Sequence, residues 1–351
     1  MTKICSKPFG KIEIDVNGNC YCCCRWWNNS YCLGNIFTDS IEEIWNGKAA
    51  KELRETILDG SYKYCNTKEC LISYDQNIKH ETIANYPEEI SLCYDYTCTA
   101  KCVFCNDNIK KMTNEEIEKW NSLIDKKLIP FFKNARFVRV NMTGELFVSE
   151  HSKKVVKLIA QTYPNIQFEI VTNGIFATKE NLQELGITDK ILTFKISLPS
   201  MKKTTYNKLV RNGNLSKVLE NLKYISTLKK DNKIEKFSLN FVINSLNYKE
   251  IIEYVRNAAK LDATVDCLML DKNNEDTEFL KHFDLYNVLD KNHPSYNHFL
   301  TLINSKEFNK FKNVNINCEI KKLEKVSFIK QLANTIRYNF RRIKKYKKVK
   351  I

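Results

Sequence analysis

The chain lacks the long apolar segments that carry proteins into or across a membrane. Its opening residues, Met-Thr-Lys-Ile-Cys-Ser-Lys, do not form the apolar core of a secretory signal. No stretch reaches the ~18 uninterrupted apolar residues of a transmembrane helix. We therefore expect a cytoplasmic protein, in which disulfide frameworks are rare. The sequence also lacks an internal repeat, which argues against a solenoid.

Histidine is scarce, whereas cysteine is abundant. The five histidines form no pair at the close helical spacing of metal ligands, and we expect His80 and His151 to lie on the surface. In a cytoplasmic chain, 14 cysteines are better explained by metal or cluster binding than by disulfides. With 43% apolar residues, the chain can also bury a sizeable core.

Composition divides the chain into three predicted domains. Residues 1–75 are rich in cysteine, residues 88–290 alternate strand-like and helix-like patterns, and residues 291–351 are helical in pattern and become strongly basic. Much of the net charge of +15 lies at the end, where residues 319–351 hold twelve Lys or Arg against Glu319 and Glu324. The rest of the chain is only mildly basic, so charge does not identify a substrate for the middle region.

The middle region predicts an α/β fold. Helical patterns begin at Thr113, where Glu116 completes a capping box, and at Asn247, and another runs from Leu215 to Ile225. They alternate with six apolar runs of strand length: 89–94, 136–142, 167–172, 191–198, 236–243 and 263–270. Such alternation forms a parallel sheet covered by helices, as an open barrel or a doubly wound sheet. In both folds, ligands bind at the carboxyl ends of the strands.

A trio of cysteines follows the first of these strands. Cys98, Cys102 and Cys105 are separated by three and two residues, so their thiolates can converge on one centre. A cubane iron–sulfur cluster held by three thiolates keeps one iron open, as a catalytic site requires. A zinc site is the alternative, and it usually takes four ligands in two close pairs.

With the aromatic Phe104 before its last cysteine, this trio resembles the signature of the radical S-adenosylmethionine superfamily. The resemblance implies a 4Fe–4S cluster whose open iron binds the amino and carboxylate groups of S-adenosylmethionine. It also implies that one electron from the cluster cleaves this cofactor, and that the resulting 5′-deoxyadenosyl radical takes hydrogen from a substrate. The implied fold is a partial (β/α)6 TIM-like barrel.

Motifs at later strand ends extend the resemblance. Thr143-Gly144-Glu145 is similar to the Gly-Gly-Glu motif that receives the amino group of S-adenosylmethionine, with a threonine in place of one glycine. A carboxylate suits an ammonium group, because the two form charge-assisted hydrogen bonds. Thr172-Asn173-Gly174 resembles the Thr-Asn-Gly turn of the same family.

Two further residues complete the implied cofactor site. Ser197 ends the fourth strand and is placed to touch the ribose or carboxylate, although Pro199-Ser200 replaces the usual Asp-Gly. Arg211 lies in a stretch similar to the family's Thr-Tyr…Arg-x-Gly segment and can grip a carboxylate in a forked geometry. The implied cofactor-binding residues are then Phe104, Thr143, Gly144, Glu145, Thr172, Asn173, Ser197 and Arg211.

The amino-terminal cysteines form a second pattern. A strand, a turn at Asn17-Gly18 and a second, cysteine-bearing strand predict a hairpin. If the fold brings Cys5 and one central cysteine to the Cys65 and Cys70 pair, four thiolates make a metal site. That site is either a cluster or the centre of a zinc ribbon-like module.

Two short sequence segments favour the cluster, because they resemble a known iron–sulfur domain. Leu-Gly-Asn-Ile at 33–36 and Ser-Ile-Glu-Glu-Ile-Trp-Asn-Gly at 40–47 resemble the SPASM domain, an auxiliary iron–sulfur module of many radical S-adenosylmethionine enzymes. In that family the module usually follows the barrel, whereas here it precedes it. Aligned on Gly18, the resemblance implies an auxiliary 4Fe–4S cluster held by Cys5, Cys23, Cys65 and Cys70. Cys20, Cys22 and Cys24 are alternatives to Cys23.

The basic end has the pattern of an amphipathic helix. An apolar stripe at helical spacing is formed by Phe328, Ile329, Leu332, Ile336 and Phe340. Such a helix can lie on an anionic membrane surface, bind nucleic acid, or dock on the protein with a solvated lysine end.

The leading hypothesis is a radical S-adenosylmethionine enzyme, of oxidoreductase or transferase class, acting on a peptide, sugar or other small molecule. A flavodoxin or ferredoxin would donate electrons, and the auxiliary cluster would transfer electrons or position the substrate. Cys267, on the sixth strand, is a candidate hydrogen donor, with a buried, inert thiol as the alternative. Two other hypotheses are an RNA-modifying enzyme, which the weak basic pattern of the middle region disfavours, and a non-enzymatic zinc or cluster scaffold at a membrane.

Overall fold

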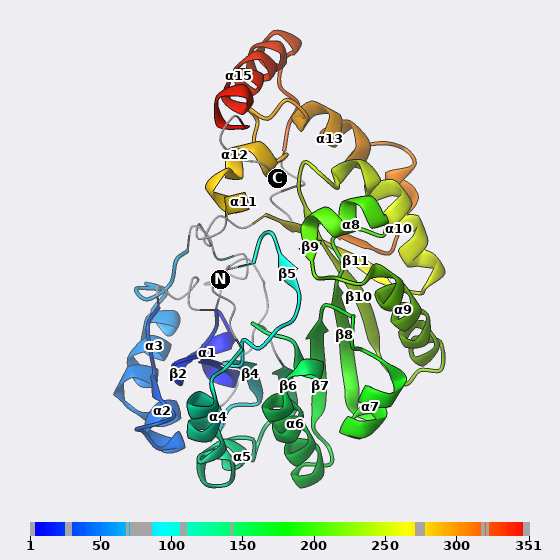
Figure 1. Cartoon of the computed structure of the whole chain (residues 1–351). Coiled ribbons are helices and arrows are strands. Elements are labelled where there is room, and N and C mark those ends of the chain that lie inside the picture. Colours follow the sequence, from blue (N-terminus) through cyan, green and yellow to red (C-terminus); the bar gives the residue numbers. More distant parts are fainter. Residues whose placement is uncertain are drawn as a thin grey trace. The chain divides into compact units, whose positions relative to one another are not determined.

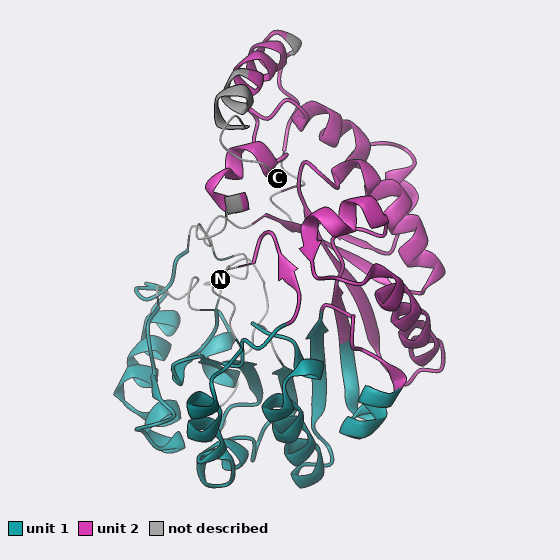
Figure 2. Ribbon diagram, in the orientation of Figure 1, with its two compact units in different colours: residues 1–98, 110–172, 180–193 teal, residues 99–109, 173–179, 194–351 magenta. Residues whose placement is uncertain are grey.

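The computed structural model describes residues 4–24, 30–67, 70, 86–105, 111–140, 143–270, 278–316, 320 and 323–346 (Figure 1). The chain divides into two compact units (Figure 2). Unit 1 comprises residues 1–98, 110–172 and 180–193, and unit 2 comprises residues 99–109, 173–179 and 194–351.

Unit 1 is built on a mostly parallel run of strands in the order β7-β6-β4-β1-β2-β3. Neighbours from β7 through β1 are parallel, and β2 and β3 add two antiparallel pairings. These strands are β1 (Lys11–Asp15), β2 (Asn19–Tyr21), β3 (Gly34–Asn35), β4 (Glu89–Cys93), β6 (Phe137–Val140) and β7 (Gln167–Thr172). The helical segments are α1 (Lys7–Gly10), α2 (Ile41–Asn46), α3 (Lys48–Leu58), α4 (Asn114–Asn121), η2 (Ile124–Leu128), α5 (Ile129–Phe131), η3 (Leu146–Val148), α6 (Glu150–Thr162), α7 (Lys179–Leu185) and η4 (Thr188–Lys190).

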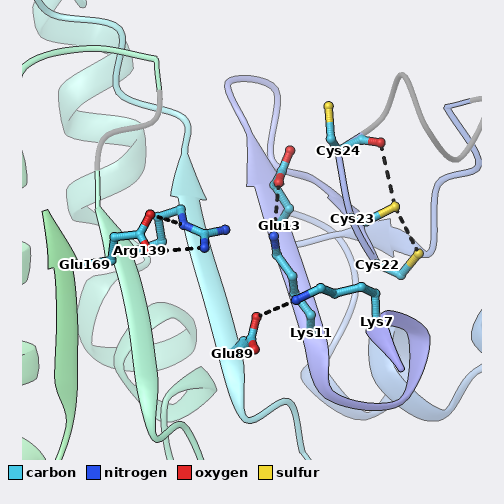
Figure 3. Close-up of polar contacts among 9 residues, drawn as sticks. All are labelled: Lys7, Lys11, Glu13, Cys22, Cys23, Cys24, Glu89, Arg139 and Glu169. Carbon is cyan, nitrogen blue, oxygen red and sulfur yellow. Dashed lines mark hydrogen bonds and ion pairs between the residues drawn. The ribbon is translucent and has the colours of Figure 1, made fainter. Parts of the chain in front are cut away.

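The cysteine-rich segment supplies strands to this sheet. Strand β1 pairs in parallel with β4, with Lys11 opposite Glu89. Ile12 and Ile14 of β1, which point to the same face of the strand, are fully buried. An ion pair of 3.2 Å joins Lys7 to Glu89 at the start of the two strands (Figure 3).

The hairpin predicted at Asn17-Gly18 is confirmed, since β1 and β2 pair antiparallel around it. Gly18 has a φ of +78°, and a Cβ there would lie 2.5 Å from the ring of Phe37. Asp15 Oδ1 accepts hydrogen bonds from the backbone N–H groups of Asn17 and Asn19, both at 2.9 Å. The turn therefore needs a residue without a side chain at position 18.

Helix starts in unit 1 also follow local sequence signals. The capping box predicted at Thr113 is present, with Glu116 as its second member, and α4 begins directly after it. Ser40 and Glu43 form the same reciprocal pair at the start of α2. Each box satisfies two backbone N–H groups that a helix start leaves without partners.

Unit 2 contains a second run of strands, ordered β12-β11-β10-β8, in which β10, β11 and β12 are parallel. A two-stranded antiparallel sheet joins β5 to β9. The strands are β5 (Lys101–Cys102), β8 (Ile191–Ser197, which begins in unit 1), β9 (Val210–Arg211), β10 (Lys236–Ile243), β11 (Thr264–Met269) and β12 (Val314–Ile316). The helical segments are α8 (Lys203–Leu209), α9 (Leu215–Lys230), η5 (Tyr248–Glu250), α10 (Ile251–Lys260), α11 (Glu278–Lys281), α12 (Phe283–Tyr286), α13 (Tyr296–Ile303), η6 (Phe308–Lys310) and α15 (Phe328–Tyr346).

The α/β class is confirmed, with a large, mostly parallel sheet. All six strands predicted in the middle region are present, as β4, β6, β7, β8, β10 and β11. The closure of these strands into a partial barrel stays a prediction. Among the described residues, no helix is both long enough and apolar enough to cross a membrane.

The prediction that His151 lies on the surface is wrong. It is 4% exposed on α6, where its ring accepts or donates hydrogen bonds of 2.9 Å with the Tyr94 hydroxyl and the Asn121 side chain. These two hydrogen bonds replace the ones that the imidazole nitrogens would make with water. Both nitrogens of the buried ring therefore keep hydrogen-bond partners. His80, the other histidine expected on the surface, lies outside the described residues.

Candidate functional site

The cysteines after β2 differ in their surroundings. Cys20 is fully buried on β2, and its pKa is raised mainly by burial and next by the neighbouring Cys32. The Sγ atoms of Cys22 and Cys23 lie 3.8 Å apart, and Cys23 also contacts the carbonyl of Cys24 (Figure 3). Cys20 therefore belongs to the core of the hairpin, whereas Cys22 and Cys23 lie together beyond its end.

The structure brings the four predicted auxiliary ligands into one electrostatic neighbourhood. The pKa of Cys65 is raised to about 12 by burial and then by the thiolates of Cys23, Cys5 and Cys70. Burial also raises the pKa of Cys5, and Cys23 and Cys70 add to that effect. Because charge–charge interactions weaken with distance, thiols that shift one another's pKa lie near each other.

Among the described residues, no three His, Cys, Asp or Glu side chains are grouped as ligands of one metal ion.

Arg54 is a residue that sequence reasoning missed. It lies on α3 at 4% exposure, where its Nε donates to the Pro8 carbonyl at 2.9 Å and its guanidinium lies 4.4 Å over the Trp45 ring. Its Nη2 is buried without a hydrogen-bond partner among the described residues. Burial lowers the pKa of Arg54, and the thiolate of Cys22 opposes that effect. A buried cation with a spare donor beside the cysteines fits an anionic group such as a thiolate-ligated cluster.

A second set of contacts fixes the segment before Cys98. Strand β4 ends at Cys93, and Asp95, 2% exposed, follows it. Asp95 Oδ1 accepts the backbone N–H of Thr97 at 2.9 Å, and Oδ2 accepts the hydroxyls of Ser149 and Ser152 at the start of α6. Asp95 was not anticipated from the sequence, because its partners lie more than fifty residues away.

The predicted Thr143-Gly144-Glu145 motif is fastened to this same segment. The Thr143 hydroxyl donates to the carbonyl of Cys93 at 2.9 Å. A Cβ on Gly144 would lie 2.4 Å from the Asp95 carbonyl oxygen, which only a glycine permits. Thr143, at the first position of the motif, therefore makes a side-chain hydrogen bond that glycine could not make.

Glu145 and Thr172, which are both predicted cofactor-binding residues, contact each other. Glu145 is 1% exposed, its backbone N–H donates to the Thr97 carbonyl at 2.8 Å, and its Oε1 accepts the Thr172 hydroxyl at 2.7 Å. Thr172 is the last residue of β7. A buried carboxylate is thus held at the carboxyl ends of the strands, where ligands bind in parallel α/β sheets.

Cys98 ends the first segment of unit 1, and Cys102 and Cys105 belong to unit 2. Cys102 lies on β5 opposite Val210 of β9, and the Cys105 N–H donates to the Cys102 carbonyl at 3.0 Å. Arg211, the next residue of β9, is exposed and lies opposite Lys101. The predicted cluster loop and the predicted carboxylate-binding arginine thus share one small sheet.

The remaining predicted residues of unit 2 lie on separate elements. Phe104 is edge-on to Phe279, with ring centroids 6.5 Å apart. Asn173 Oδ1 accepts the N–H of Ile175 at 2.9 Å, which shapes the turn after β7, and Ser197 is exposed at the end of β8.

Cys267 is 1% exposed on β11, opposite Phe241 of β10. Its pKa is raised to about 12, mainly by burial. These surroundings are those of an inert core thiol.

A family model described as an iron–sulfur cluster-binding domain, SPASM, matches residues 5–71. The chain is 26% identical over 164 residues to GTP 3′,8-cyclase of Lactiplantibacillus plantarum, a match that covers 45% of this chain and 46% of the relative. The chain therefore spans less than half the length of that curated relative.

Two solved structures are similar over parts of the chain. SuiB of Streptococcus suis, bound to S-adenosylmethionine, has a TM-score of 0.46 and 15% identity over 80% of this chain and 64% of its own. The anSMEcpe structure with bound AdoMet has a TM-score of 0.37 and 18% identity over 52% of each chain. These TM-scores are too low for either structure to support an argument.

The family match identifies the amino-terminal domain. Residues 5–71 match a SPASM iron–sulfur cluster-binding domain, which lies ahead of a mixed α/β region. The predicted resemblance to radical S-adenosylmethionine enzymes with a SPASM domain is borne out for this domain, in its amino-terminal position.

Proposed function

We propose that this protein is a radical S-adenosylmethionine enzyme, which cleaves S-adenosylmethionine reductively at a 4Fe–4S cluster held by Cys98, Cys102 and Cys105. When bound, the cluster and the cofactor supply a 5′-deoxyadenosyl radical that abstracts hydrogen from a substrate. The observation that supports this proposal best is the attachment of the Thr143-Gly144-Glu145 motif to the segment leading into Cys98. A carboxylate and a cluster ligand are thereby held by one short stretch of backbone.

Glu145 is the residue that we assign to the amino group of the cofactor. Glu145 is 1% exposed, so its carboxylate has lost most of its contact with water. A nearby cation stabilises such a buried carboxylate. The ammonium group of S-adenosylmethionine supplies such a cation, and the Thr172 hydroxyl orients the carboxylate by donating to Oε1. Phe104, Asn173, Ser197 and Arg211 would contact other parts of the cofactor.

We also propose that Cys5, Cys23, Cys65 and Cys70 hold the auxiliary 4Fe–4S cluster of the SPASM domain. The effects of Cys23 and Cys70 on the pKa of Cys5 and Cys65, and the unpaired Nη2 donor of Arg54, support this choice. The cluster would transfer an electron or position the substrate, and a flavodoxin or ferredoxin would reduce the enzyme.

The substrate class that we propose is a peptide, sugar or other small molecule. The domains would be residues 1–75 for the auxiliary cluster, 88–290 for the radical core and 291–351 for the extension.

The first test is 5′-deoxyadenosine formation by anaerobically reconstituted protein with S-adenosylmethionine and a strong reductant. Wild-type protein should form the product, Cys102→Ala should form none, and Lys101→Ala, the exposed neighbour on β5, should retain activity. Absence of product from a wild-type protein that holds zinc and no iron would exclude the proposal.

Two variants separate the cofactor site from the auxiliary site. Glu145→Gln keeps an oxygen that can accept from Thr172 but removes the charge, so it should weaken binding of S-adenosylmethionine about tenfold or more without loss of iron. Cys65→Ser should lower iron content while Cys32→Ser, a SPASM-domain cysteine outside the proposed set, should not. Equal iron loss in both cysteine variants would contradict the ligand assignment.

A further inference from the structure

Helix α15 is the last described helix of unit 2 (Figure 1). It contacts the rest of that unit through polar side chains. Gln331 Nε2 donates to the carbonyls of His293 and Pro294 at 2.9 and 2.6 Å. Asn334, 4% exposed, donates to the Lys291 carbonyl at 3.0 Å, and the Tyr338 hydroxyl donates to the Leu285 carbonyl at 3.1 Å. These three residues, spaced by three and four positions, define the inner face of the helix.

Ile329, Leu332 and Ile336 of the apolar stripe therefore face away from the protein. Ile329, Leu332 and Ile336 are 81%, 53% and 51% exposed, more than the other exposed large hydrophobic residues of the described chain. An amphipathic helix of a globular protein normally buries its apolar stripe and exposes its polar one. The reversed arrangement leaves apolar surface in water, which marks a place where another apolar phase binds.

Positive charge accompanies this stripe. Residues 325–351 contain ten Lys or Arg and no Asp or Glu. Lys330 and Arg337 are exposed, lie seven residues apart on one side of α15, and form no ion pair with any residue that the structure describes. The next position at this spacing, 344, is again a lysine in the sequence. A positively charged border thus runs along the exposed apolar face.

We propose that α15 binds the surface of an anionic lipid bilayer, with Ile329, Leu332 and Ile336 inserted between the headgroups and the basic residues contacting acidic lipids. A bilayer surface offers both an apolar layer and a negative charge, and this helix presents the complement of both. A second copy of the chain would place two dense positive surfaces together, which charge repulsion opposes. Nucleic acid would match the charge but leave the apolar stripe in water.

The test is flotation of the full-length, reconstituted protein with vesicles of phosphatidylcholine alone or mixed with phosphatidylserine. The protein should float with the mixed vesicles and remain behind with phosphatidylcholine alone, and added salt should weaken the binding. Leu332→Gln combined with Ile336→Gln should weaken binding about tenfold or more, because two side chains no longer insert. Since both side chains are exposed, the fold should survive, as thermal unfolding would verify.

Leu246→Gln, which changes an exposed leucine elsewhere in unit 2 (37% exposed), is the matched control and should bind like the wild type. Absence of flotation with the mixed vesicles would overturn the proposal. So would vesicle binding that the glutamine substitutions leave unchanged while Arg337→Gln reduces it, because charge alone would then explain it. A dimer in sedimentation that the glutamine substitutions dissociate would assign the face to a second copy instead.

Discussion

Gly144 is a position at which the backbone of a distant segment sharply limits which side chain the protein can accept. Alanine there would place its Cβ 2.4 Å from the Asp95 carbonyl oxygen and 2.9 and 3.0 Å from the Thr97 carbonyl oxygen and nitrogen. All three contacts are with backbone atoms, so no flexible side chain can move aside. The segment from Asp95 to Thr97 must shift, although the Asp95 carboxylate holds it to the start of α6.

The expected cost of Gly144→Ala follows from this geometry. Overpacking a tightly fitted site destabilises a protein by about 1–3 kcal/mol. The displaced segment leads directly into Cys98, and a displacement on the order of 1 Å at a reacting centre can lower a rate by about a hundredfold. We therefore expect a measurable fall in the free energy of unfolding and a fall of about tenfold to a hundredfold in 5′-deoxyadenosine formation.

Two measurements separate the two effects. Denaturant unfolding gives the loss of stability, and the initial rate of 5′-deoxyadenosine formation at saturating S-adenosylmethionine gives the loss of function. Gly10→Ala is the matched control, because a Cβ at Gly10 meets nothing within 4 Å. If Gly144→Ala were as stable and as active as Gly10→Ala, the proposed attachment of the motif to the segment before Cys98 would be wrong.

Two further predictions concern buried basic side chains. Arg54→Met keeps a long apolar side chain but removes the positive charge near Cys22, so the auxiliary cluster should become harder to reduce. A redox titration followed by electron paramagnetic resonance should show a more negative potential with unchanged iron content, and an unchanged potential would remove Arg54 from the cluster's surroundings. For His151, burial lowers the pKa, so the unfolded chain takes up a proton more readily than the folded one. Stability from this residue is present above about pH 6.5 and is lost as the pH falls below that value. The melting temperature of the wild type should therefore drop more steeply below this pH than that of His151→Gln. Parallel curves of melting temperature against pH would refute this prediction.

Much of the local structure could be predicted because its causes are local. The turn at Gly18, the capping boxes at Thr113 and Ser40, and the apolar runs of the six strands each depend on residues within a few positions of one another. The SPASM domain was predictable for a different reason. The cysteine pattern and the sequence segments 33–36 and 40–47 resemble that family, and the domain match at residues 5–71 bears the resemblance out.

The contributions of Asp95, Arg54 and His151 could not be predicted, because each depends on contacts between distant parts of the chain. Asp95 receives hydroxyls from residues 54 and 57 positions away, and Arg54 donates to a carbonyl 46 positions away. In the sequence each is a polar residue that would ordinarily be placed on the surface. Only the fold shows that each is buried with partners suited to its charge.

The pairing of β1 with β4 gives a physical reason why a SPASM domain can precede the α/β region. Strand β4 leads into the segment that ends at Cys98. The backbone hydrogen-bonding groups on both of its edges need partners. On one side it pairs with β6, which is followed by the Thr143-Gly144-Glu145 motif. On the other side it would expose an unpaired edge, which invites association with other chains. The β1–β2 hairpin of the cysteine-rich segment covers that edge over the register from Lys11 to Asp15. The hairpin that leads into Cys22 and Cys23 is therefore also part of the sheet that positions Cys98, and changes that loosen it should disturb both proposed clusters.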